Sequence, residues 1–63
     1  MRTIVKDARG ATLGYINEDG SRKTLYDTAG AMLGWYNEGQ NRTYDRNGVM
    51  IGYGDQLTRL LKD

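Results

Sequence analysis

The acidic residues are the first candidates for chemistry in this chain of 63 residues. Asp7, Asp27 and Asp45 recur at similar spacing, and carboxylates are common groups in general acid–base catalysis. Each of them, however, opens an Asp-x-x-Gly sequence, and Asp and Gly at this spacing are the residues that a tight turn requires. We therefore interpret the three carboxylates as turn residues and expect no catalytic residue among them.

Composition limits other reactive arrangements. The chain has no histidine and no cysteine, which excludes Ser-His-Asp and Cys-His sets and disulfides, and makes a zinc site hard to build. The cluster Glu18-Asp19-Gly20 lacks the alternating acids of a calcium-binding loop and is typical of a hairpin tip. The segment Gly10-Ala11-Thr12-Leu13-Gly14 matches no nucleotide-binding fingerprint. We expect a protein that is not an enzyme and that holds no metal and no cofactor.

The turns belong to an internal repeat. The pattern Asp-x-x-Gly-x-x-(Leu/Ile)-Gly-(aromatic) is written three times, starting at Asp7, Asp27 and Asp45. A short repeat of this kind sets the architecture, because each copy is one supersecondary unit. The chain is predicted to be a single domain, with repeats at about residues 3–21, 22–41 and 42–54.

Each copy is predicted to be a β-hairpin with a three-residue loop, which closes in a G1 bulge on a glycine with positive φ. The predicted fold is all-β, with three tandem hairpins forming a twisted meander, a small barrel-like sheet or a short solenoid. The six strands are expected at about residues 2–7, 11–17, 22–27, 31–37, 42–45 and 49–54. Residues 55–62 change to helical spacing, with Asp55 suited to the N-cap and Arg59 and Lys62 to the last turn, and predict a short C-terminal helix.

Counting back from the turns predicts which side chains share the core. If Asp7 lies opposite Ala11, then Val5 faces Leu13, and the later copies follow the same register. The leucines of the C-terminal helix would cover one end of this core. The predicted core consists of Val5, Leu13, Tyr15, Leu25, Leu33, Trp35, Val49, Ile51 and Tyr53.

Alternation along the strands assigns other apolar residues to the opposite side of the sheet. A contiguous exposed band of this kind usually marks an interaction surface. The predicted interaction face consists of Tyr26, Met32, Tyr36, Tyr44 and Met50. Gly14, Gly34 and Gly52 fall on the same face, where a recurrent glycine marks strong bending, a bulge, or close approach by another backbone or ring.

Size and charge bear on the partners. The net charge is +1 with the two signs interleaved, and the apolar stretches are too short to span a bilayer, so a soluble, cytoplasmic protein is expected. A domain of this size buries only about 60% of the surface that its unfolded chain exposes. Because disulfides cannot add stability, we expect a homo-oligomer, with a dimer favoured.

Nucleic acid is the least favoured partner. Arg42, Tyr44 and Arg46 place two guanidinium groups beside an aromatic ring, and small β-sheet proteins bind single strands through such sets. A net charge of +1 is nevertheless far from the basic character expected of a nucleic-acid-binding domain. On sequence alone, single-stranded nucleic-acid binding is therefore a less favoured alternative.

About a third of the chain resembles a known family. The run Gly34-Trp35-Tyr36-Asn37-Glu38-Gly39, followed by Thr43-Tyr44, Asn47-Gly48-Val49-Met50 and a closing Gly52-Tyr53, resembles the choline-binding repeats of bacterial cell-wall proteins. The resemblance implies stacked hairpins and an aromatic cage around a quaternary ammonium, formed here by Trp35, Tyr44 and Tyr53. The chain departs from that pattern because Tyr44 stands alone where the repeats have tandem aromatics, and the first copy has no tryptophan.

The Tyr-Asp-x-x-Gly runs that start at Tyr26 and Tyr44 are also similar to the tyrosine-aspartate repeats of large bacterial surface and toxin proteins. Both resemblances imply a bacterial or phage hairpin-repeat protein. We expect a non-catalytic interaction or structural module that acts as a homo-oligomer, as a subunit or inhibitor of a larger assembly. The alternative is a repeat module that binds a carbohydrate or a choline-like cation.

Overall fold

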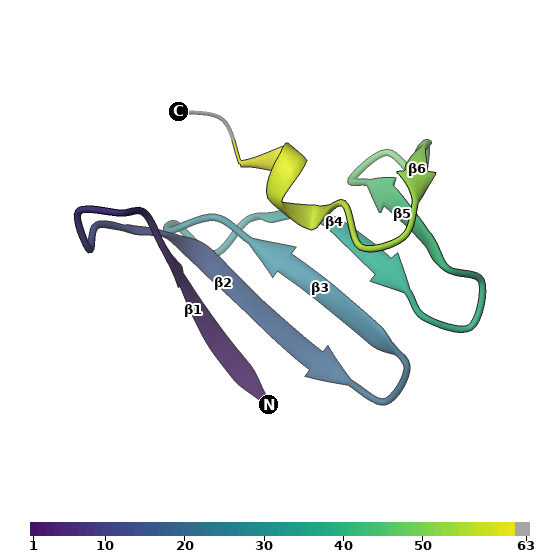
Figure 1. Ribbon diagram of the computed structural model, residues 1–63, viewed down its shortest axis with the longest axis horizontal. Coiled ribbons are helices and arrows are strands. Elements are labelled where there is room, and N and C mark those ends of the chain that lie inside the picture. Colours follow the sequence, from purple (N-terminus) through teal and green to yellow (C-terminus); the bar gives the residue numbers. More distant parts are fainter. Residues whose placement is uncertain (62–63) are drawn as a thin grey trace.

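The computed structural model describes residues 1–61 and confirms an all-β fold. The strands form one antiparallel sheet in which each pairs with the next along the chain, and the sheet does not close into a barrel (Figure 1). The elements are β1 (Arg2–Lys6), β2 (Thr12–Asp19), β3 (Arg22–Tyr26), β4 (Met32–Asn37), β5 (Arg42–Asp45), β6 (Met50–Tyr53) and a 3-10 turn, η1 (Leu57–Leu60).

The turn chemistry of the repeat is confirmed. In the first copy, the amides of Arg9 and Ala11 both donate to Oδ1 of Asp7 at 2.9 Å. Gly10 takes a φ of 87° and donates its amide to the Asp7 carbonyl oxygen at 3.0 Å. The turns that start at Asp27 and Asp45 repeat these bonds. Each Asp carboxylate is therefore engaged by its own turn, as its position in Asp-x-x-Gly predicts.

The predicted register is correct at the turn and wrong beyond it. Asp7 lies opposite Ala11, but Val5 pairs with Gly14 instead of Leu13. The reason is a β-bulge, which inserts one extra residue in the second strand of the hairpin. Equivalent register shifts occur in the β3–β4 and β5–β6 pairs. Because side chains alternate with a period of two, this slip of one residue exchanges the two faces of the sheet beyond each bulge.

The core consequently differs from the predicted one. Its buried members are Leu25, Tyr36 and Leu57, with Val5, Ile16, Leu33, Leu60 and Leu61 packed against them. Tyr15 and Trp35, which were expected in the core, lie on the opposite face, and Val49 and Tyr53 are exposed. Tyr36, which was expected on the interaction face, is only 9% exposed.

The repeated strand glycines lie on the inner face, next to the core, and not on the predicted interaction face. Gly14 pairs with Val5 and Gly34 with Leu25, and both glycines are buried. A Cβ atom at Gly34 would meet the carbonyl oxygen of Tyr44 and the side chain of Leu60. The second glycine of the motif therefore allows close approach by a neighbouring strand and by the C-terminal segment.

The C-terminal segment covers the inner face, as predicted, but not as the expected helix of residues 55–62. It forms the single 3-10 turn η1, whose N-cap is Gln56 without a side-chain cap bond, and Lys62 lies outside the described residues. The segment is tied down by Thr43, whose hydroxyl donates to the Gly54 carbonyl oxygen at 2.7 Å and accepts from the Gln56 amide at 2.9 Å. So short a helix gains little from its own hydrogen bonds, and tertiary anchors of this kind decide its conformation.

Candidate interaction surface

The side of the sheet opposite η1 is the candidate functional site, and we call it the open face. Ile16 and Leu25 pair on the inner side, so their neighbours Tyr15 and Tyr26 pair on the outer side. Within residues 1–61, no other element covers this face (Figure 1). It carries five aromatic side chains, which are Tyr15, Tyr26, Trp35, Tyr44 and Tyr53.

A stacked aromatic pair occupies the middle of the open face. Trp35 of β4 lies directly opposite Tyr44 of β5, with ring centroids 5.4 Å apart and ring planes inclined by 25°. The Tyr44 hydroxyl donates to Oε1 of Gln40 at 2.9 Å, which fixes the orientation of that ring. Offset stacking is a favoured geometry for aromatic pairs, and here each ring covers part of the π face of the other.

An arginine accompanies an aromatic ring in each repeat. The guanidinium carbon of Arg2 lies 4.7 Å from the ring centroid of Tyr15, and that of Arg22 lies 4.9 Å from the ring of Trp35. In the third repeat, the guanidinium of Arg42 lies 5.8 Å from the ring of Tyr53. These distances are within the range of cation–π attraction. The nearby Tyr44 and Tyr53 side chains raise the pKa of Arg42 above its usual value. Arginine is already fully protonated at neutral pH without such a shift.

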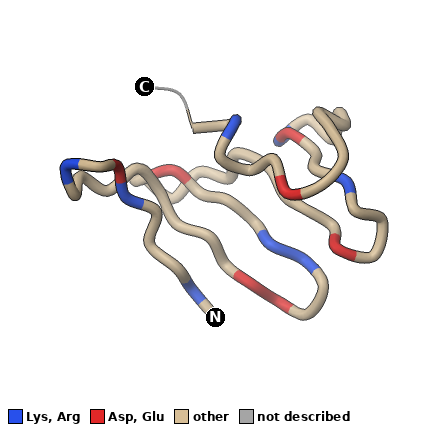
Figure 2. Tube along the Cα trace, in the orientation of Figure 1, with Lys and Arg blue, Asp and Glu red and all other residues tan. Residues whose placement is uncertain are grey.

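The charges are divided unevenly between the two faces. The strand positions of the open face carry four basic residues and one acidic residue, which gives a net charge of +3. These residues are Arg2, Lys6, Arg22, Arg42 and Asp19. On the inner side, Nζ of Lys23 lies 3.7 Å from Glu18 and 3.5 Å from Asp55. Charged residues of both signs are spread along the chain (Figure 2), so only the pairing of the strands reveals this division. The open face is basic although the whole chain carries only +1.

Most of the predicted interaction residues lie together on the open face. Tyr26 pairs with Met32, and Tyr44 pairs with Met50, on the outer side of the sheet. Tyr36 is the exception, because it packs in the core and its hydroxyl donates to Oδ1 of Asn41 at 2.9 Å. The band predicted from alternation is thus present without its central tyrosine.

The predicted ligand aromatics also share this face, but they do not form the walls of a cage. Trp35 and Tyr44 lie nearly parallel, whereas a cage needs rings that enclose a cation from several sides. Arg22 and Arg42 already lie over the rings of Trp35 and Tyr53. A quaternary ammonium would have to compete with the chain's own cations for these rings.

Sequence reasoning placed Arg42 beside Tyr44, but it did not bring Tyr15, Arg2 and Arg22 onto the same surface. Arg2 and Arg22 stand 20 residues apart at equivalent places in two repeats, which is a signal that the sequence contains. Their position over aromatic rings depends on the bulges, and the register counted from the turns placed those rings in the core. Of the run Arg42-Tyr44-Arg46, the first two side chains lie on the open face and Arg46 belongs to a turn.

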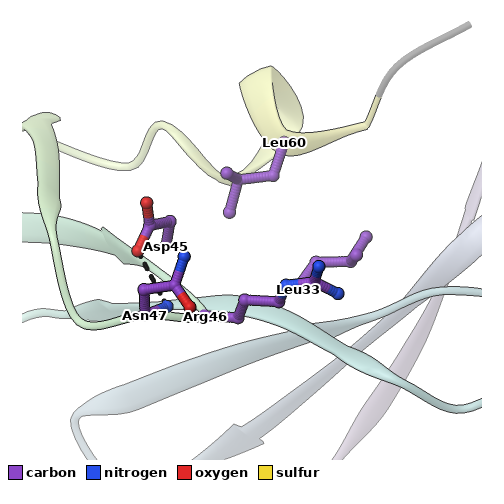
Figure 3. A pocket seen from close by; sticks show the side chains of 5 residues that line it. All are labelled: Leu33, Asp45, Arg46, Asn47 and Leu60. Atoms are coloured by element: carbon purple, nitrogen blue, oxygen red, sulfur yellow. Dashed lines mark hydrogen bonds between the residues drawn. The ribbon is translucent and has the colours of Figure 1, made fainter.

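Two hollows lie at turns of the repeat. One, of about 310 Å³, is lined by Leu33, Asp45, Arg46, Asn47 and Leu60 (Figure 3). The only carboxylate in it, that of Asp45, accepts bonds from the amides of its own turn. A second hollow, of about 440 Å³, lies at the corresponding turn of the first repeat, with Asp7, Ala8, Arg9 and Leu13. Their recurrence with the turns makes these hollows products of the hairpin geometry.

Comparison with family models, curated proteins and solved structures gave no match to this chain. Within residues 1–61, no helix has the length and apolar character needed to cross a membrane, and no three acidic side chains are grouped as a metal site would require.

Proposed function

We propose that the protein is a non-catalytic interaction module that recognises its partner through the open face. The observation that carries this proposal is the Trp35–Tyr44 stack, which lies outside the core on a face that no described element covers. In a chain with a single tryptophan and few buried side chains, folding alone would favour this residue in the core. Its position outside favours a role in recognition.

The composition of the open face supports the same proposal. Tyrosine, tryptophan, methionine and arginine are the residue types enriched at recognition surfaces, and tryptophan, tyrosine and arginine carry most of the binding energy there. All four types meet on the open face, with Met32 and Met50 beside the aromatic rings. The carboxylates of Asp7, Asp27 and Asp45 are each bound by two turn amides, which supports a structural role for them.

The expected homo-oligomer is better placed at the edge of the sheet than on the open face. Two copies of the open face would oppose basic side chains, and like charges at an interface are unfavourable. Strand β1 pairs only with β2, so its other edge is free. The exposed Ile4 of this strand lies between Arg2 and Lys6, and the side chains of all three belong to the open face. Unpaired strand edges join other strands readily, so we propose this edge for self-association.

A carbohydrate or a choline-like cation is the alternative ligand. The Trp35–Tyr44 surface could stack against a sugar ring, whereas the arginines over Trp35 and Tyr53 disfavour a quaternary ammonium. This alternative uses the same face, so it differs from the main proposal in the ligand and not in the site.

The test of the proposed function compares what two tagged proteins retain from a lysate of the source cells, with protein, nucleic acid and glycan all measured. One is the wild-type chain, and the other carries Tyr26→Ser, Tyr44→Ser and Tyr53→Ser on the open face. Circular dichroism must show that the variant is folded. We expect the wild type to retain at least one component that the variant does not. Identical retention by the two folded proteins would refute the open face as the recognition surface.

A further inference from the structure

We propose that the open face binds a single strand of nucleic acid. This inference rests on the proposed function and adds the chemical class of the partner. It depends on two features that the structure places together, namely a net charge of +3 and a series of aromatic rings, each close to a guanidinium group.

Charge complementarity indicates that the partner is negatively charged. Within residues 1–61, no salt bridge of 4.0 Å or less joins Arg2, Arg22 or Arg42 to an acidic side chain. The basic residue of the inner side, Lys23, is in contrast paired with two carboxylates. The cations of the open face are thus available to phosphate groups, which are the main source of affinity in nucleic-acid binding.

The rings give the partner's second property, which is an exposed π face. Tyr15, Trp35 and Tyr53 lie on β2, β4 and β6, which are alternate strands of the sheet. Neighbouring strands are about 4.8 Å apart, and the register displaces each of these rings by two residues, about 7 Å along the strands, from the one before. A polymer that crosses the sheet diagonally therefore meets one of these rings about every 12 Å. Unpaired bases stack on such rings whatever their sequence, while the adjacent arginines contact the backbone.

A single strand fits these features better than a duplex or a protein. The bases of a duplex are stacked on each other, so a duplex could use the cations but not the rings. An acidic protein segment could likewise use the cations and would gain less from the rings, because carboxylate groups are not aromatic and the negative faces of the rings repel them. Guanidinium–ring contacts at exposed sites are weak, so the arginines can turn from the rings to the phosphates when a base stacks.

The test is fluorescence anisotropy of a labelled oligothymidylate of about 12 nucleotides, titrated with the full chain. With three arginines at phosphates, log affinity should fall against log salt with a slope of about −2, which is about a 20-fold loss between 50 and 200 mM salt. The same titration should quench the emission of Trp35, the single tryptophan, because a stacked base contacts its surface. No binding at 50 mM salt, or binding with a flat salt response, would overturn the inference.

Two double variants distinguish binding by the cations of the open face from a general effect of the protein's net charge. Arg22→Gln with Arg42→Gln removes two cations of the open face, and Arg9→Gln with Arg46→Gln removes two cations of the turns. The face variant should lose about tenfold or more in affinity and reduce the salt slope by about 1.4, while the turn variant keeps the slope. Equal losses in the two variants would overturn the inference.

Stacking is tested with Tyr53→Leu, because this ring is exposed and its replacement keeps apolar bulk. We expect about a fivefold or greater loss of affinity. An unlabelled duplex and polyglutamate, used as competitors, should each displace the probe less well than the unlabelled single strand. Equal competition by either one would overturn the single-strand assignment. If these tests fail while the lysate comparison still separates wild type from variant, the proposed function stands with a partner of another class.

Discussion

Trp35 of β4 stacks on Tyr44 of β5 at a centroid distance of 5.4 Å, on the face of the sheet opposite η1. The bulge between β3 and β4 pairs Gly34 with Leu25 and turns Trp35 outward. One inserted residue thus assigns a glycine to the core and the single tryptophan to the surface. If the proposed function holds, stability and recognition are carried by opposite faces of the same strands, so substitutions on each face should have different effects.

Substitution of Leu57 should destabilise the protein more than substitution of any other residue in the C-terminal segment. The Leu57 side chain is 1% exposed and packs on Leu25 and Tyr36. Leu57→Ala should lower the free energy of unfolding by about 2–4 kcal/mol, because it removes buried methyl groups and leaves a cavity. Urea denaturation followed by circular dichroism measures the change. Met32→Ala on the open face is the matched control and should cost less than about 1 kcal/mol.

Thr43→Val should destabilise the protein although the two side chains have nearly the same shape. The buried Thr43 hydroxyl bonds the Gly54 carbonyl oxygen and the Gln56 amide, and valine would leave both without this partner. A loss of about 1–3 kcal/mol in the free energy of unfolding is expected. Thr24→Val on the open face is the control and should be nearly neutral. If both variants unfold at the same urea concentration, the Thr43 bonds do not anchor the C-terminal segment.

Gly34→Ala should lower the free energy of unfolding because the added methyl group is crowded, and not because alanine disfavours the backbone conformation. The added methyl group would meet the Tyr44 carbonyl oxygen and the Leu60 side chain. We expect a loss of about 1–3 kcal/mol, measured by thermal or urea unfolding. Gly39→Ala is the comparison, since its added methyl group would approach only the end of the Asn37 side chain. Equal stability of the two alanine variants would contradict close packing at Gly34.

The elements of the fold could be predicted because their signals are local. In each Asp-x-x-Gly turn, the carboxylate and the glycine act within five residues, and the observed bonds at Asp7 are the ones that this sequence predicts. The strand bounds follow from the turns. The leucines after residue 55 also carry a local signal, their spacing, which marked them as an apolar segment able to cover the core.

The face of the sheet on which each side chain lies could not be predicted by counting residues from the turns. The bulge in the second strand of each hairpin depends on contacts between segments that are far apart in the chain. The extra residue at Leu13 depends on how closely Gly14 approaches the neighbouring strand and Leu61, which lies 47 positions further along the chain. The recurrent strand glycine was the available signal, since such residues mark bulges and close approach. The open face was therefore predicted in part, through Tyr26, Tyr44 and the neighbouring Arg42, while Arg2 and Arg22 were placed over their rings only by the observed register.

Self-association through β1 can be tested without damage to the sheet. The Met1 and Glu18 backbones exchange hydrogen bonds and the Asp7 amide bonds Ala11, so by alternation the amide of Ile4 points to the free edge. Ile4→Pro removes this edge donor and leaves the bonds to β2 in place. Light scattering should give a mass above the monomer for the wild type and the monomer mass for the variant. A wild-type oligomer that survives in the folded variant would move self-association to another surface.

The emission of Trp35 during addition of oligothymidylate at low salt tests the central claim most directly, because this single tryptophan lies in the middle of the open face. Saturable quenching is predicted, with a midpoint that moves to higher oligonucleotide concentration as salt is raised and with a weaker effect in the Arg22→Gln, Arg42→Gln variant. Emission that stays unchanged while anisotropy reports binding would contradict recognition through this face.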